Sequence, residues 1–195
     1  MCEFLTIEEL LSAEGREAET DVSYIPFPNV VDIVISDELA PDHLTPTAFV
    51  FPFFGNGDLM MAHNRRRQVE VPGGHRDPVE GGELEHPRET ARREGFEETG
   101  VVVEDIVPVG FMRARSAAEG MPSGYRYPFP VSCQQFFAAR IVSVVDFDET
   151  DECRPPVRLS EQEVEEVLGG RSLALYRAAK EALFPSAKIA SAPTP

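Results

Sequence analysis

The sequence is poor in cysteine, in basic residues and in long apolar runs. Its three cysteines, Cys2, Cys133 and Cys153, have spacings that predict neither a disulfide framework nor a zinc site, so we expect a reducing, cytoplasmic location. No apolar run approaches the roughly 18 residues that a membrane span needs, and the N-terminus lacks the basic start of a signal peptide. We therefore expect no membrane association.

Acidic residues outnumber basic ones in this chain. Lysine and arginine together number 18, against 34 aspartates and glutamates, which gives a net charge of −16 at pH 7. Nucleic-acid backbones and anionic membrane surfaces need clustered positive charge, so we expect neither as a partner. A small anionic molecule is compatible with this balance if metal ions neutralise it locally.

Internal repeats are also absent, and the length favours one folded domain. With 195 residues and 42% apolar content, a second independent domain would be cramped. We expect an N-terminal extension over residues 1–45 with a short helix and a strand, a main domain over residues 46–184, and a disordered tail over residues 185–195. The extension could cap the fold, shape a substrate pocket or pair with a second subunit in a homodimer.

A helix is expected over residues 87–99, because its first residue is a proline and Gly100 suits the position just past its end. On this helix Glu94, Glu97 and Glu98 stand at i, i+3 and i+4, so three carboxylates share one face and repel one another unless a cation lies among them. Hard oxygen ligands of this kind suit Mg²⁺ or Mn²⁺. The alternative is a solvated charged face, as on most helices rich in Glu and Arg.

Two neighbouring features favour the metal site. Arg93 can reach Glu97 or Glu89 one turn away and would hold the carboxylates in register. Gly73 and Gly74 follow a β-type run and a proline, and a glycine pair lets the backbone come close to a ligand or ion. The site therefore combines a glycine loop with an acidic helix.

This combination resembles the signature box of the Nudix (MutT-like) hydrolase family. In that box a glycine, five residues, a glutamate and seven residues precede the pattern R-E-U-x-E-E-x-G-U, where U is a bulky apolar residue. Residues 93–101, REGFEETGV, fit the pattern with one exception. Glu85 lies seven residues before Arg93, as the box requires.

The chain departs from the box at two places. Gly95 stands at the first U position, which costs about 1 kcal/mol of helix propensity and loses a buried side chain. Ten residues rather than five separate Gly74 from Glu85, which indicates an insertion over about 76–82 and lets Glu83 compete for the role of the first glutamate. Neither departure removes a metal-binding carboxylate.

The resemblance implies a fold, a metal and a reaction. The fold is α/β, a Nudix-like α/β/α sandwich with a mixed β-sheet, which agrees with a hairpin signal and with the absence of repeated βαβ units. The metal is Mg²⁺ or Mn²⁺, held by Glu94, Glu97, Glu98 and the carbonyl of Gly73. The reaction is hydrolysis of a nucleoside diphosphate linked to another group, in which divalent ions neutralise the phosphates and acidify water. Residues outside the box would decide what that group is.

Further site residues rest on weaker signals. The family often draws its general base from outside the box; Glu94 is our first candidate and Glu119, in a loop that could cover a pocket, is the second. Arg93 is assigned to the catalytic group because it holds the carboxylates. Side chains that can contact the phosphate oxygens or a ring of the substrate are predicted to bind it. They are Arg65, Arg67, Arg113, Arg115 and Tyr125. Solvated loop positions are the plainer interpretation of Arg65, Arg67 and Glu119.

The extension carries one helix signal and one strand signal. Thr6 and Glu9 form a capping-box pattern that predicts a short amphipathic helix ending near Gly15. Residues 16–23 are polar and are interpreted as a linker. Residues 30–35, VVDIVI, are β-branched and too few for a helix, so they predict a strand.

Strands dominate the predictions on both sides of the box. Residues 47–54 predict a strand that Pro52 interrupts, which indicates an edge or a bulge, and residues 55–58 predict a hairpin turn into a strand over 59–62. After the box we expect extended chain over 101–115, a loop over 116–130, a long strand over 131–144, an acidic loop over 147–156, and helices over 160–168 and 172–184.

Two other functions stay open. A Nudix-like domain can bind a nucleotide without cleaving it, and the usual mark of such a domain is loss of box glutamates, which are all present here. The isoprenoid diphosphate isomerase branch of the fold uses a cysteine and glutamates for proton transfer, and Cys133 is a weak candidate for that role.

Overall fold

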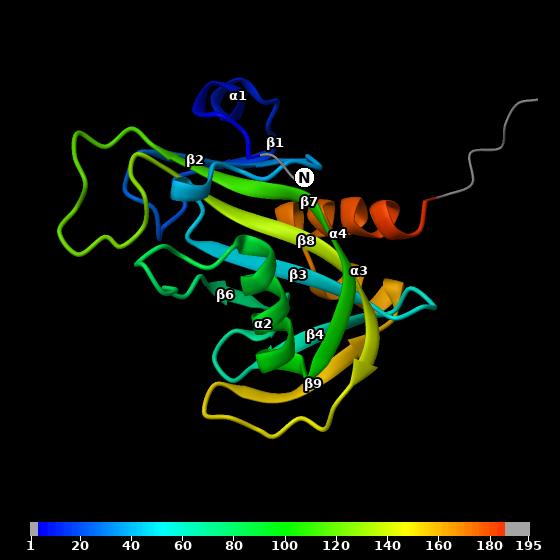
Figure 1. The fold of residues 1–195 in the computed structure, drawn as a ribbon. Coiled ribbons are helices and arrows are strands. Elements are labelled where there is room, and N and C mark those ends of the chain that lie inside the picture. The colour runs from blue at the N-terminus through cyan, green and yellow to red at the C-terminus, as the bar shows by residue number, and fades with distance from the viewer. Residues whose placement is uncertain (1–3, 186–195) are drawn as a thin grey trace, which may run out of the picture.

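The computed structural model describes residues 4–185 and shows a nine-stranded sheet with helices on both faces (Figure 1). The elements before the acidic helix are α1 (Ile7–Ser12), β1 (Arg16–Thr20), β2 (Asn29–Val34), the 3-10 helix η1 (Asp42–Leu44), β3 (Thr47–Phe53), β4 (Leu59–Asn64), β5 (Gln68–Glu70) and β6 (Gly73–His75). The acidic helix is α2 (Pro87–Thr99), followed by β7 (Val101–Ser116), β8 (Val131–Val144), β9 (Cys153–Leu159), α3 (Glu161–Val167) and α4 (Gly170–Leu183). The predicted mixed α/β fold is confirmed.

The sheet has the strand order β1-β2-β7-β8-β3-β4-β5, with β6 paired to β3 and β9 paired to β4. Strands β3 and β8 are parallel, and the other pairs are antiparallel. The long strands expected on either side of the 116–130 loop are present as β7 and β8. Within residues 4–185, no helix is both long and apolar enough to cross a membrane.

Strand β3 separates two apolar cores. Because side chains alternate along a strand, Ala48 and Val50 face α2 and pack with Ala91 of that helix. Phe51 and Phe53 face the other way and pack with residues of α4. Figure 1 shows α2 and α4 on opposite faces of the sheet, so the acidic helix and the C-terminal helix form the two outer layers.

The predicted edge position of β3 is wrong, because β8 lies on one side of β3 and β6 and β4 lie on the other. Pro52 lies where β3 changes hydrogen-bonding partner, from the residue before β6 to the residue before β4. The Val50 N–H donates to Pro72 O at 3.0 Å, and the Phe54 N–H donates to Asp58 O at 2.9 Å. Successive N–H groups of a strand alternate in direction, so the missing N–H of Pro52 falls between these two bonds.

The turn after β3 is the predicted hairpin. The Gly57 N–H donates to Phe54 O at 2.9 Å, and Gly57 has a φ of 89°, in the region that favours glycine. The chain then returns through β4, which begins at Leu59.

The N-terminal extension is part of the sheet. Its first helix has the predicted capping box, in which Thr6 and Glu9 exchange hydrogen bonds. The predicted linker over 16–23 is wrong at its start, because residues 16–20 form strand β1, which pairs with β2. All five residues of β1 are exposed, so the strand shows none of the apolar alternation that reveals a half-buried strand.

A buried ion pair fastens the extension to the main domain. Arg113 on β7 donates to both carboxylate oxygens of Asp32 on β2, at 2.9 and 2.7 Å, and both side chains are less than 5% exposed. The same guanidinium donates to the carbonyls of Leu10 and Ala13 at the end of α1. Gly15 lies against this pair, since a Cβ there would stand 2.0 Å from Asp32 Oδ2.

Two C-terminal boundaries differ from the predictions. The acidic loop ends earlier than expected, because β9 begins at Cys153 and pairs with β4. Helix α4 begins at Gly170, two residues before the predicted start at Ser172, with Gly169 as its N-cap. Helix α3 has the predicted capping box between Ser160 and Glu163. The predicted tail lies outside the described residues from residue 186 onward.

Candidate active site

Helix α2 has the predicted bounds and caps. Pro87 occupies its first turn, and the His86 side chain accepts a hydrogen bond from the Arg88 N–H at the N-cap. At the other end Gly100 adopts a left-handed conformation with φ 68°, and its N–H donates to Phe96 O at 2.8 Å. These caps fix where the helix begins and ends, and therefore which face its glutamates occupy.

Strand β6 brings two glycines against this helix. The Gly73 N–H donates to Glu98 Oε2 at 2.9 Å. A Cβ on Gly74 would stand 2.5 Å from Glu94 Oε1, and a Cβ on Gly73 would stand 2.4 Å from Phe49 Cδ1. A side chain at Gly73 would overlap Phe49 and the Ala48 carbonyl, and one at Gly74 would displace the Glu94 carboxylate, so the close approach expected of the glycine pair is present.

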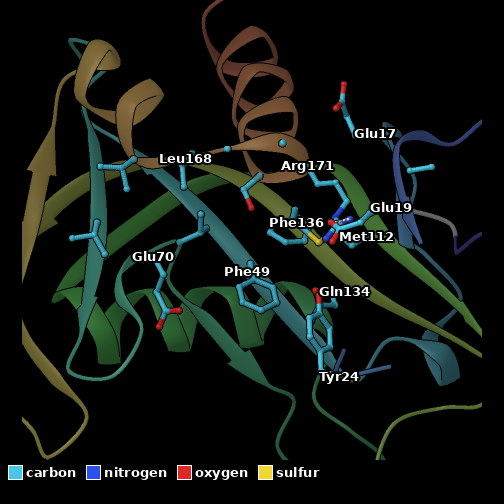
Figure 2. A pocket seen from close by; sticks show the side chains of 17 residues that line it. Glu17, Glu19, Tyr24, Phe49, Glu70, Met112, Gln134, Phe136, Leu168 and Arg171 are labelled. Atoms are coloured by element: carbon cyan, nitrogen blue, oxygen red, sulfur yellow. Dashed lines mark hydrogen bonds and ion pairs between the residues drawn. The ribbon is translucent and has the colours of Figure 1, made fainter. Parts of the chain in front are cut away.

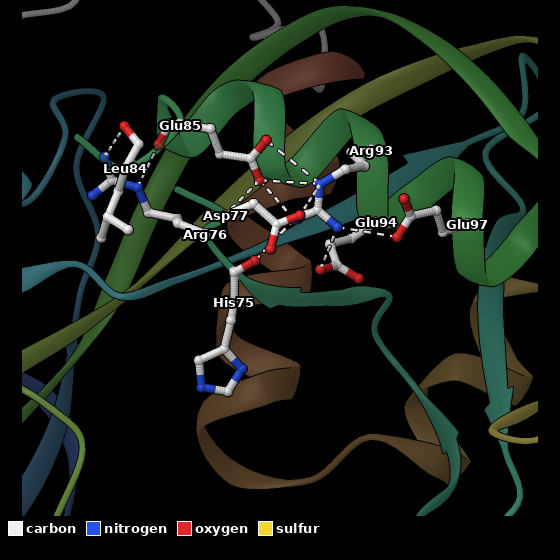
Figure 3. Close-up of polar contacts among 8 residues, drawn as sticks. All are labelled: His75, Arg76, Asp77, Leu84, Glu85, Arg93, Glu94 and Glu97. Carbon is white, nitrogen blue, oxygen red and sulfur yellow. Dashed lines mark hydrogen bonds and ion pairs between the residues drawn. The ribbon is translucent and has the colours of Figure 1, made fainter. Parts of the chain in front are cut away.

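Arg93 connects the carboxylates of this site (Figure 3). Its guanidinium donates to Glu85 Oε1 at 2.6 Å, to Glu94 Oε1 at 2.9 Å and to Glu97 Oε2 at 3.0 Å. It also donates to the carbonyl of His75 at 2.9 Å, which ties α2 to β6. Glu85, rather than the exposed Glu83, thus has the position next to Arg93.

The segment between Gly74 and Glu85 is anchored by its first arginine. Arg76 is 5% exposed and donates to the carbonyls of Thr45 and Glu85 and to the Asp42 carboxylate. The longer loop therefore returns the chain to α2 with Glu85 in place, even though it has more residues than the family pattern.

Carboxylates in this region have shifted pKa values. Burial raises the pKa of Glu98 to about 7, against the hydrogen bond from Gly73, and the charges of Glu94 and Glu70 raise it further. Burial also raises the pKa of Glu94 and that of Glu70. At Glu85, burial raises the pKa, but hydrogen bonds from Arg93, Thr90 and the Asp77 N–H together with the charge of Arg93 lower it on balance. Glu70, Glu94 and Glu98 thus form a partly buried group of like charges that a cation would stabilise.

Glu70 did not emerge from the sequence. It lies on β5, three residues before Gly73, and its only charged contact is Arg67 at 3.0 Å within the described part of the chain. Its Oε1 is buried without a well-directed hydrogen bond. The available signal was its position at the end of the strand that leads into the glycine pair, which places it close to the ligands of any bound ion.

A cavity of about 740 Å³, here called the sheet cavity, opens on the α4 side of the sheet next to this site (Figure 2). Its floor comes from β3, β7 and β8, and its walls come from β1, β5 and the turn between α3 and α4. The residues that line it include Glu19, Tyr24, Phe49, Glu70, Gln134 and Arg171. Its size is that of small-molecule sites in proteins.

Comparison with known proteins decides the family. The profile described as the NUDIX domain matches residues 43–183. The chain belongs to the NUDIX domain family. A comparison with curated protein sequences found no match. Among solved structures, a variant of the pyrophosphohydrolase BsRppH from Bacillus subtilis is similar in fold, with 20% identity, a TM-score of 0.58, and coverage of 82% of this chain and 96% of that chain.

A second NUDIX structure has a comparable fold. The NUDIX domain of Shewanella oneidensis NrtR, complexed with ADP ribose, is 17% identical, with a TM-score of 0.50 and coverage of 71% of this chain and 88% of that chain. At these identities the two likenesses show the shared fold. The predicted membership of the Nudix family is confirmed.

The NUDIX site has the donor chemistry for a divalent ion. The nearby side-chain donors are carboxylate oxygens, and the half-buried group around Glu98 has excess negative charge. No three His, Cys, Asp or Glu side chains within residues 4–185 already surround one point. The physical reason is that Arg93 holds Glu94 and Glu97, while Glu98 accepts from Gly73.

The predicted arginines do not gather at one site, although Arg113 and Arg115 both pair with Asp32. Arg65 bonds to Glu149 and to the carbonyl of Thr150, and Arg67 pairs with Glu70 beside the sheet cavity. Arg113 is 2% exposed, and its donors serve Asp32 and α1. No donor of Arg113 is therefore free to face a substrate.

The remaining predicted residues lie around the 116–130 loop. Arg115 pairs with Asp32 at 2.8 Å, on the β2 side of β7. Tyr125 forms an edge contact with Tyr127 and lines a smaller cavity of about 60 Å³, which shares Tyr24 and Gln134 with the sheet cavity. Glu119 is exposed in the loop. Tyr125 is thus close to the sheet cavity, whereas Arg115 belongs to the cluster around Asp32.

Proposed function

We propose that this NUDIX protein is a pyrophosphohydrolase that uses Mg²⁺ or Mn²⁺ to hydrolyse a nucleoside diphosphate linked to another group. The observation that carries the proposal is the contact between α2 and β6, where Glu94 and Glu98 lie against the glycine pair and Arg93 connects Glu94 with Glu97. The pyrophosphohydrolase BsRppH and the ADP-ribose complex of the NrtR NUDIX domain, two structures of similar fold, are compatible with it.

The chain's own residues have separate roles in this proposal. Glu94, Glu97, Glu98 and the carbonyl of Gly73 would hold the cation, which neutralises phosphate charge and makes a bound water more acidic. Arg93 keeps α2 and β6 together through the His75 carbonyl, so the ligands keep their spacing. Glu94 accepts the proton of the attacking water.

The isomerase alternative needs a reactive cysteine, and Cys133 does not meet that requirement. It is 0% exposed, and burial raises the pKa of its thiol to about 12. A thiol that is neither accessible nor ionised is a poor proton-transfer group.

Because Cys133 and Cys153 are both free thiols, we also propose a reducing, cytoplasmic location.

Metal dependence provides the direct test of the proposal. We expect cleavage of the phosphoanhydride bond, measured as formation of a nucleoside monophosphate from a panel of nucleotides and nucleotide sugars, in Mg²⁺ or Mn²⁺ and none in EDTA. Glu97→Gln and Glu98→Gln should each lower kcat by at least about a hundredfold, because an amide is a neutral ligand. Glu83→Gln, which changes an exposed glutamate of the preceding loop, is the control. Nucleotide binding without turnover of any substrate would instead favour the non-catalytic alternative.

The general base is tested separately, with metal at saturation. Glu94 is 14% exposed and lies beside Gly74, whereas Glu119 is exposed in the 116–130 loop. A base contributes about 10²- to 10⁴-fold in rate, so Glu94→Gln should lose at least a hundredfold in kcat and Glu119→Gln less than about tenfold. A small loss in Glu94→Gln would overturn the assignment of the base.

A further inference from the structure

One wall of the sheet cavity comes from outside the matched domain. The NUDIX match begins at residue 43, but Glu19 of β1 and Tyr24, which follows β1, both line the cavity. Figure 2 shows these two side chains and Arg171 of α4 around the same opening. The extension therefore contributes to the cavity as well as to the sheet.

The floor of the cavity is aromatic. Phe49 of β3 stacks on Phe136 of β8, with ring centroids 4.9 Å apart and an interplanar angle of 14°. Phe49 is only partly buried, and Tyr24 is 59% exposed, so aromatic surface is available to a ligand. Flat aromatic surfaces of this kind suit a planar ring, and each base stacked on such a side chain adds to binding.

Two polar groups in the cavity can recognise such a ring. The Nε of Arg171 is buried without a hydrogen-bond partner in the described part of the chain. The same side chain is 15% exposed and is held by Glu19 Oε2 at 2.7 Å, an ion pair that spans from α4 to β1. Gln134 adds an amide, which can both donate and accept.

The charges around the cavity disfavour a phosphate. Glu17, Glu19 and Glu70 line it, against Arg171, whose charge is already paired with Glu19. A phosphate placed there would meet an excess of negative charge, so an uncharged group fits better.

The cavity is directly adjacent to the proposed reaction site. Phe49 lies against Gly73, where a Cβ would stand 2.4 Å from its ring. Glu70 lines the cavity and is close enough to Glu98 for its charge to raise the pKa of Glu98. A ligand in the cavity could therefore extend its phosphates toward the carboxylates of α2.

We propose that the sheet cavity binds the uncharged nucleoside end of the substrate, with the base against Phe49 and Tyr24, and that residues 16–25 form a specificity wall. Arg171 contributes a polar contact to the base, and Glu19 is a positioning residue that holds Arg171. The substrate role rests on the proposed function, but nucleoside binding can be measured without turnover.

The first experiment measures nucleoside binding in EDTA by ligand-observed NMR. The probes are adenosine, guanosine, cytidine and uridine, with ribose 5-phosphate as a base-free anion. The wild-type chain should bind at least one nucleoside and bind ribose 5-phosphate at least tenfold more weakly. Tyr24→Ala should weaken nucleoside binding about tenfold, and Tyr24→Leu, which keeps apolar bulk, should weaken it as well. Leu11→Ala, an exposed position of α1 outside the cavity, is the control.

The outcomes separate this inference from the proposed function. Equal binding of ribose 5-phosphate and nucleosides, or unchanged binding in both folded Tyr24 variants, would overturn the specificity wall even if the chain hydrolyses nucleotides. The opposite result is that nucleoside binding depends on Tyr24 but the chain hydrolyses no substrate on the panel. That result would support the specificity wall and refute the proposed pyrophosphohydrolase activity.

The role of Glu19 is tested by steady-state kinetics. Glu19→Gln frees Arg171 from its ion pair, so KM for the best substrate should rise about threefold to tenfold while kcat is unchanged. Glu19→Asp, which keeps the charge, should recover part of the loss, and Glu14→Gln, an exposed glutamate outside the cavity, is the control. If Glu19→Gln lowers kcat by as much as it raises KM, positioning of Arg171 is ruled out. It is also ruled out if Glu19→Asp and Glu19→Gln raise KM equally.

Discussion

Gly95 marks a close approach between α2 and strand β3. It is buried, and a Cβ there would stand 3.1 Å from Val50 Cγ1 and 3.7 Å from Val101 Cγ2. The bulky residue that the family pattern has at this position would therefore overlap β3. Val50 of this chain fills the space that such a side chain would otherwise occupy.

This contact limits what Gly95 can become. Gly95→Ala gains up to about 1 kcal/mol of helix propensity but compresses Val50, so we expect the free energy of unfolding to change by less than about 1 kcal/mol. Gly95→Leu should destabilise by about 3 kcal/mol, because β3 cannot yield that far. Urea denaturation measures both, with Gly120→Ala at an open loop glycine as the control. A well-folded, stable Gly95→Leu would show that α2 is free to move outward.

Glu98 predicts how stability depends on pH in the absence of metal. Its pKa is raised from 4.5 to about 7 by burial, so the folded chain holds this proton more tightly than the unfolded chain does. The stabilising contribution is present below about pH 4.5 and is lost as the pH rises to about 7. After allowance for solvent screening, we expect the loss to be roughly 1–2 kcal/mol.

Chemical denaturation in EDTA at several pH values tests this expectation. Glu98→Gln should flatten the dependence between about pH 5 and pH 8, whereas Glu97→Gln, whose side chain is 52% exposed, should leave it unchanged. The same proton competes with a cation, so metal affinity should fall as the pH drops below about 7. A Glu98→Gln variant with the wild-type dependence would assign the effect to another group.

Among the elements, β2 and β7 depend on one buried pair. Removing the guanidinium in Arg113→Met would leave Asp32 without its main partner in a site that is less than 5% exposed. We expect a loss of about 3–5 kcal/mol in the free energy of unfolding, and Arg113→Met with Asp32→Leu should recover part of it. Arg126→Met in the exposed loop is the control. A loss below about 1 kcal/mol would mean that apolar packing and the antiparallel pairing of β2 with β7 hold the extension without help from the ion pair.

The elements that could be predicted from sequence carry strong local signals. The proline, the terminal glycine and the glutamate spacing of α2 are contained within 14 residues, and the structure has the helix at those bounds. Strand β1 could not be predicted, because its exposed residues show no alternation. Pro52 suggested an edge strand because proline has no N–H to donate. The sequence cannot show that Pro52 lies between two hydrogen bonds to different segments, from Val50 to Pro72 and from Phe54 to Asp58.

At the scale of the whole molecule, the box was predictable and the cavity was not. The box is local, so its residues reveal one another by spacing. The sheet cavity collects residues from Glu17 to Ser172, and none of these positions has a local pattern that points to the others. Glu70 illustrates the difference, because it becomes part of the site only when the folded chain brings its charge close to Glu98.

The ion pair between Asp32 and Arg113 also limits which segments of this protein can be exchanged by recombination. Asp32 precedes the segment 43–183 that matches the family, and Arg113 lies within it. A recombination event that transferred the matched segment alone would deliver a buried guanidinium without its counterion. We therefore expect any exchange between relatives to preserve both partners or to replace both together.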